Sequence, residues 1–138
     1  TSLPLPDTEA GRQLLASENQ VLQQNALKTT VIRLGGLIGE NRHPVKFLSG
    51  RKSLPDGDAY INFIHQSDAI GLIGHVLNQQ LTGIVHGVAP HHPKKKDYYP
   101  SEAKKLGIAP PEYASGSGDK NYKKVLSTLN YPYRFTFN

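Results

Sequence analysis

Two junctions of the chain hold the residues whose types and spacing could do chemistry. Residues 31–39, VIRLGGLIG, and residues 61–70, INFIHQSDAI, each begin as an apolar run and continue into glycines or polar side chains. Such a run predicts a buried strand that leads directly into a loop or a helix start. In α/β proteins, ligands bind at the carboxyl ends of strands. Gly35, Gly36 and His65 are therefore the first candidates for a binding site.

The chemistry at these junctions has more than one interpretation. Gly35, Gly36 and Gly39 match neither the dinucleotide fingerprint nor a P-loop. They fit either a tight turn after a buried strand or close backbone approach to a flat or charged ligand. His65 leaves a similar choice between a ligand contact and a half-buried ring that hydrogen-bonds to the backbone. We interpret Asp68 as a first-turn acid that complements a helix dipole.

Composition argues against several function classes. The chain has no Cys, which removes disulfides, thiolate catalysis and Cys-ligated metals. Its six histidines lack the spacing and carboxylate partners of a zinc site, so we predict no metal. No apolar run approaches the roughly 18 residues that span a bilayer, so no membrane partner is expected. The cysteine usage is compatible with the cytosol, and we expect a cytoplasmic location.

The positive charge of the chain is concentrated in its last third. Residues 1–88 balance seven Lys/Arg against seven Asp/Glu, whereas residues 89–138 hold nine against four. The lysines of residues 94–96, 104–105 and 123–124 have the spacing of solvated helix faces. We favour that interpretation over a nucleic-acid surface, and keep a basic nucleic-acid adaptor as a second alternative function.

Hydrophobic periodicity and turn residues predict alternating helices and strands. The first helix is capped by Asp7 or Thr8, the third by Ser67 or Asp68, and Pro100 breaks the fourth or lies in its first turn. The predicted helices are 8–25, 43–48, one from 67 or 68 onward, 94–106 and 120–129, and the predicted strands are 29–34, 59–64 and 83–88. The first strand is β-branched and apolar, so we expect it to be parallel and buried on both faces. The alternation indicates an α/β sheet covered by helices.

The ordered blocks resemble the second half of the extended short-chain dehydrogenase/reductases, the NAD(P)-dependent epimerases and dehydratases. The resemblance lies in residues 31–39, in Arg42-His43-Pro44, in residues 62–69 and in the ending from 94 to 131. It spans about residues 8–138. It implies an α/β fold made of the C-terminal part of a Rossmann-type parallel sheet plus a small substrate-binding lobe, with residues 1–88 in the sheet and 89–138 in the lobe.

The resemblance also implies a site. It places Gly35, Gly36 and Leu37 beside the nicotinamide of NAD or NADP, Arg42 and His43 toward a small-molecule substrate, and His65 at the edge of that cleft. The dinucleotide fingerprint would lie upstream of Thr1. Together with the absence of Met, this leads us to expect a fragment that pairs with its own N-terminal half or with another copy of the chain.

Two departures from the family pattern bear on activity. The catalytic Tyr-x-x-x-Lys pair of the family falls on Ala10 and Leu14 here, and the first helix contains neither Tyr nor Lys. The arginine that holds a sugar-nucleotide diphosphate is replaced by Ile61. The sequence therefore leaves open an enzyme that uses other groups and a non-catalytic dinucleotide-binding or regulatory protein of the same fold.

Overall fold

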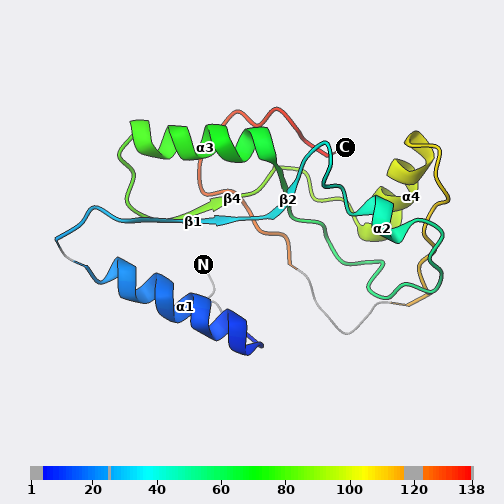
Figure 1. The fold of residues 1–138 in the computed structure, drawn as a ribbon, viewed down its shortest axis with the longest axis horizontal. Coiled ribbons are helices and arrows are strands. Elements are labelled where there is room, and N and C mark those ends of the chain that lie inside the picture. Colours follow the sequence, from blue (N-terminus) through cyan, green and yellow to red (C-terminus); the bar gives the residue numbers. More distant parts are fainter. Residues whose placement is uncertain (1–4, 25, 117–122, 138) are drawn as a thin grey trace.

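The computed structural model describes residues 5–24, 26–116 and 123–137, and Figure 1 shows how their elements are arranged. Helices and short parallel strands alternate along the chain. In order they are α1 (Glu9–Leu22), β1 (Thr30–Leu34), β2 (Gly36–Ile38), α2 (Val45–Leu48), β3 (Phe63–His65), α3 (Gln66–Asn78), β4 (Gly83–Gly87) and α4 (Lys95–Lys105). The α/β class predicted from the sequence is confirmed.

Two parallel strand pairs form the sheet. β1 pairs with β4, so that Ile32 lies opposite Val85, and β2 pairs with β3, so that Leu37 lies opposite Ile64. The parallel direction of β1 was predicted correctly. Its burial on both faces was not, because β1 is only half-buried along its length and Leu34 is exposed. β2 was missed, since a three-residue strand that begins with glycine has the sequence of a turn.

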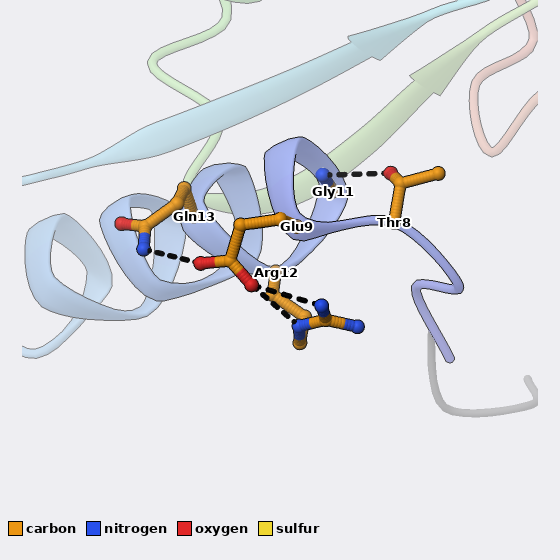
Figure 2. Close-up of polar contacts among 5 residues, drawn as sticks. All are labelled: Thr8, Glu9, Gly11, Arg12 and Gln13. Carbon is orange, nitrogen blue, oxygen red and sulfur yellow. Dashed lines mark hydrogen bonds and ion pairs between the residues drawn. The ribbon is translucent and has the colours of Figure 1, made fainter.

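Two helices lie on opposite sides of the β1–β4 pair, with α1 on one side and α3 on the other (Figure 1). α1 begins where the sequence predicted, since the Thr8 hydroxyl accepts a hydrogen bond from Gly11 N at 3.1 Å. Figure 2 shows this cap together with Glu9, whose carboxylate accepts from Arg12 Nε at 2.9 Å and Gln13 Nε2 at 2.8 Å. α1 is therefore stabilised locally, and it buries none of its own residues.

The junction from β3 to α3 differs from the prediction in two details. The strand covers only Phe63–His65, because Tyr60 makes just an isolated bridge with Lys94. The cap of α3 is His65 rather than Ser67 or Asp68, since its Nδ1 accepts from Ser67 N at 3.2 Å. The imidazole thus does what a shorter polar side chain does at most helix starts.

The other end of the molecule is a lobe, by which we mean α2, α4 and the segments packed between them. Its core consists of side chains that are at least nine-tenths buried: Ile38, Val45, Ile61, Phe63, Tyr98, Tyr99 and Ala103. α4 does not break at Pro100, which lies in its second turn and removes one backbone donor. α4 ends at Lys105, close to the predicted residue 106, and Gly107 follows with a positive φ, where Gly107 N bonds to Lys104 O and Ile108 N to Ala103 O.

The last segment of the chain is not helical. The helix predicted over 120–129 is wrong for its described residues, 123–129, which form no regular element, and residues 120–122 lie outside the described part. Residues 127–137 run beside β4 and α3 instead: Ser127 Oγ donates to His86 O of β4 at 3.1 Å, and Arg134 N donates to Asp68 Oδ1 of α3 at 3.0 Å. The boundary at residue 88 between sheet and lobe stays a prediction, and α2, from before that boundary, packs against α4.

Candidate functional site

A cavity of about 420 Å³ opens between the carboxyl ends of β2 and β3 and the lobe. Five segments contribute to its wall: the end of β2 and its loop, α2, the end of β3, α4 and the C-terminal segment. The lining residues that could contact a ligand are Gly39, Glu40, His43, Lys46, His65, Tyr98, Glu102, Lys105, Phe135 and Phe137. Its volume lies within the range of small-molecule sites.

His43 and Tyr98 are hydrogen-bonded to each other in this wall. His43 Nε2 lies 3.0 Å from the Tyr98 hydroxyl, and His43 Nδ1 accepts from Val45 N at 3.2 Å. Burial lowers the pKa of the His43 imidazole, which favours its neutral form. Burial, with a smaller contribution from Glu102, raises the pKa of the Tyr98 hydroxyl well above its usual value. Both groups are therefore neutral hydrogen-bonding groups at pH 7.

His65 lies at the edge of the same cavity, as the resemblance implied for it. Its ring stacks on Phe135, with 3.6 Å between ring centroids and 19° between planes, and its Nδ1 caps α3. The interpretation of His65 as a ring that bonds to the backbone is confirmed, and its contact with a ligand stays a prediction, since the ring also lines the cavity.

The glycines predicted to approach a cofactor have a packing reason to be glycine. A Cβ at Gly35 would lie 2.6 Å from Asn62 O, and one at Gly36 would lie 2.8 Å from the Phe63 ring. These contacts bring β2 against β3. Gly36 and Leu37 are also exposed, so this stretch of backbone is open to a further contact on its other side.

Arg42 does not reach the cavity wall. Its backbone closes a turn with Gly39, with N–O distances of 3.0 and 3.4 Å, and its side chain is exposed. Gly35, Gly36 and Leu37 are likewise absent from the lining. The structure therefore brings His43 and His65 together, and leaves the expected cofactor stretch on a separate surface at the start of β2.

Asp68 has a role that the sequence interpretation did not give it. It is 1% exposed, and its two carboxylate oxygens accept from Arg134 N and Phe135 N, each at 3.0 Å. The dipole interpretation is incomplete, because this carboxylate also holds the C-terminal segment that carries Phe135 and Phe137 to the cavity.

Sequence reasoning missed Tyr98, Phe135 and Phe137. Tyr98 follows a lysine run on a helix, where its neighbours indicate a solvated face, and the two phenylalanines lie in a segment of alternating aromatic residues that does not reveal what it packs against. One signal was available: every tyrosine falls at or after residue 60, and Tyr98 and Tyr99 are part of the lobe core.

Lys94 and Lys96 pair with one acid of the same chain, Asp58. Asp58 Oδ1 lies 2.8 Å from Lys96 Nζ and 2.9 Å from Lys94 Nζ, and these two ammonium groups lower the pKa of Asp58 to about 2. Within the described residues, no group of three or more His, Asp or Glu side chains is placed to hold a metal ion. No helix in the described ranges is long and apolar enough to cross a membrane.

Comparison with known proteins agrees with this geometry. No family model matches the chain. Protein YeeZ of Escherichia coli K12 is 32% identical over 136 residues, which cover 94% of this chain and 49% of YeeZ. A 3-diazoavenalumate denitrifying reductase from Streptomyces is 26% identical over 116 residues, covering 78% of this chain and 38% of the reductase. The chain thus spans about half the length of the curated relatives it matches, or less.

A solved structure decides the fold. The dTDP-glucose 4,6-dehydratase of Bacillus anthracis, determined in complex with NAD, superposes on 98% of this chain and 50% of its own, with a TM-score of 0.78 at 14% identity. The chain has the fold of the NAD-dependent epimerases and dehydratases. The resemblance inferred from the sequence is confirmed at that level, and the two parallel strand pairs belong to a Rossmann-type sheet.

α1 is the helix on which the resemblance to the epimerases and dehydratases places the family's catalytic pair. The sequence aligns the catalytic pair of the family with Ala10 and Leu14, and both lie on the exposed surface of α1, where Leu14 is 68% exposed. The helix offers no proton donor or ammonium group there.

Proposed function

We propose that this chain is the second half of an NAD(P)-dependent epimerase-, dehydratase- or reductase-like protein, and that it supplies the substrate lobe and part of the cofactor cleft. One observation carries the proposal: the cavity at the carboxyl ends of β2 and β3 is lined by a hydrogen-bonded His43–Tyr98 pair within a Rossmann-type fold. Ligands of such sheets bind at strand ends of this kind.

The cofactor would be NAD or NADP, held mainly by residues outside this chain. Gly36 and Leu37 are exposed and uncharged, which suits contact with the flat nicotinamide ring at the start of β2. The chain itself has no glycine-rich phosphate loop. When bound, the nicotinamide would supply or accept a hydride.

The second part of the proposal is that a partner covers the surface of the sheet that is left open here. A hollow of about 350 Å³ lies between β1 and α3, lined mainly by aliphatic side chains that include Ile32, Ile73 and Leu77. Each strand pair has only two strands, so strand edges remain that a further strand could extend, although residues 127 and 128 already bond to His86 on the β4 edge. The partner that would cover them is the N-terminal half of the protein or a second copy of the chain.

A titration of the protein expressed from its full open reading frame tests the cofactor assignment. NADPH and NADH are added while their fluorescence is followed, and saturable binding of at least one supports the proposal. As a matched pair, Leu37→Glu should weaken binding severalfold because it places a carboxylate near an anionic cofactor, whereas Phe47→Glu, on exposed α2, should not. Absence of binding by either nucleotide overturns the proposal.

The alternative is a non-catalytic dinucleotide-binding or regulatory protein of the same fold. It is favoured by Ala10 and Leu14, since no residue of α1 can act as the proton donor of the family. Saturable NADPH binding without hydride transfer to a panel of aldehydes and ketones would support it. Turnover of any of them would exclude it.

A basic nucleic-acid adaptor is less well supported. Lys94 and Lys96 form ion pairs with Asp58, and Lys105 lies 2.6 Å from Glu102, so the charge of these lysines is partly neutralised within the chain. Phosphate binding would need those charges free.

A cytoplasmic location remains part of the proposal rather than a finding.

A further inference from the structure

The hydroxyl of Tyr98 is buried, and its proton has no hydrogen-bond acceptor among the described residues. Tyr98 is 6% exposed and lines the 420 Å³ cavity. A phenol has one donor and two acceptor positions. Among the described residues, its one hydrogen-bond partner is His43 Nε2, at 3.0 Å.

The tautomer of His43 decides which of the two groups donates. Val45 N donates to His43 Nδ1, so Nδ1 of the neutral ring carries no proton. The ring proton is therefore on Nε2 and is donated to the oxygen of Tyr98. This leaves the O–H proton of Tyr98 without an acceptor in the described part of the chain, on a side chain that faces a cavity.

The rest of the wall limits what can accept that proton. Phe135 and Phe137 supply aromatic surface, and His65 stacks on Phe135. Glu102 and Lys105 are paired with each other at 2.6 Å, and Glu40 and Lys46 add one charge of each sign, so the formal charges of the lining balance. A cavity of this size is at the small end of ligand sites and cannot enclose a dinucleotide.

We propose that Tyr98, oriented by His43, donates a hydrogen bond to the carbonyl or hydroxyl oxygen of a small, uncharged, largely apolar substrate that lies against Phe135 and Phe137. This rests on the proposed function for the identity of the cofactor, but the oxygen-binding step itself is independent of it. Tyr98 is a substrate-binding residue and His43 is its positioning residue. Such a site selects an oxygen-bearing ring compound over the same ring without oxygen, because the buried donor would otherwise remain unsatisfied.

Two probes with the same aromatic ring, one with a carbonyl group and one without, test this selection. Benzaldehyde and toluene are titrated into the protein from its full open reading frame, with and without NADPH, and binding is followed by NMR. Tyr98→Phe should weaken benzaldehyde binding about three- to tenfold, the loss of one hydrogen bond, and should leave toluene binding unchanged. Tyr99→Phe is the matched control, because Tyr99 is adjacent, equally buried and lines a different hollow.

A second readout does not depend on a variant. The carbonyl stretch of bound benzaldehyde should lie at lower frequency than in cyclohexane, as expected for a hydrogen-bonded carbonyl. The proposal is overturned if that stretch is unshifted, if Tyr98→Phe weakens both probes equally or neither, or if benzaldehyde does not bind the wild-type protein. If Tyr98→Phe weakens the binding of benzaldehyde but not of toluene, and the protein does not bind NADPH, then the oxygen-binding site is supported and only the nicotinamide assignment is overturned.

Discussion

The lobe and the sheet end of this molecule differ in how they bury apolar side chains. In the lobe, Val45, Tyr98 and Ala103 are almost completely buried in one aromatic and aliphatic core. At the sheet end, made of α1, β1 and β4, Leu14 and Val21 of α1 are 68% and 47% exposed. Large exposed apolar surfaces mark interaction sites. The lobe thus closes a core of its own, whereas the sheet end leaves apolar side chains of α1 exposed.

The largest effect is expected from a substitution that disrupts the lobe core. Phe63 is 8% exposed and makes edge-on ring contacts with Tyr98, Tyr99 and Phe137. Phe63→Ala should lower the free energy of unfolding by about 3–5 kcal/mol, measured by urea denaturation. Leu14→Ala in α1 should change it by less than about 0.5 kcal/mol in residues 1–138 alone. Equal losses for both variants would contradict the difference between the two regions.

A smaller effect is expected when the C-terminal segment loses its bonds to Asp68 of α3. Asp68→Asn keeps one acceptor oxygen but removes the charge that binds Arg134 N and Phe135 N. We expect a loss of about 1.5–3 kcal/mol, the value of hydrogen bonds to charged groups. Limited proteolysis should then cleave near residues 134–137 faster than in the wild type. Unchanged stability and unchanged cleavage would show that this carboxylate does not anchor the segment.

Two glycine substitutions compare the tight packing around Gly35, just before β2, with the open space beside Gly74 in α3. Gly35→Ala places a Cβ 2.6 Å from Asn62 O and should cost about 1–3 kcal/mol. Gly74→Ala meets nothing within 4 Å in the interior of α3, so it should stabilise the protein by about 0.5–1 kcal/mol. Thermal denaturation of the two variants should shift in opposite directions. A stabilising Gly35→Ala would refute the close approach of β2 to β3.

The smallest effect is the pH dependence that Asp58 adds to the lobe. Lys96 and Lys94 lower its pKa from 3.8 to about 2 in the folded chain, so these contacts stabilise the fold above about pH 4. That stabilisation is lost as the pH falls toward 2. Urea midpoints measured across this window should fall less for Asp58→Asn than for the wild type, and Asp7→Asn should behave like the wild type. Parallel curves for all three proteins would argue against the ion pairs.

The sequence was informative where structure is local. The cap at Thr8 and the end of α4 near the predicted residue 106 depend on neighbours within a few residues, and both are confirmed. The burial of Asp68 depends on residues more than 60 positions away, which no local pattern reveals.

The candidate site shows the same limit. His43 and His65 were expected at the cleft because motifs of the family contain them, and the structure brings both to one cavity. Tyr98 was missed, because its lysine-rich helix has the composition of a surface and only the packing against Phe63 turns it inward. Pro100 likewise remains in α4 because tertiary packing overrides its helix-breaking tendency.

Hydrogen exchange of the protein from its full open reading frame, with and without NADPH, tests the central claim most directly. We predict slower amide exchange at Gly35–Leu37 on NADPH binding, and no change in α4, because the proposed function puts the cofactor at the start of β2 and the substrate in the cavity at the lobe. Unchanged exchange at Gly35–Leu37, or slowing confined to α4, would contradict the account.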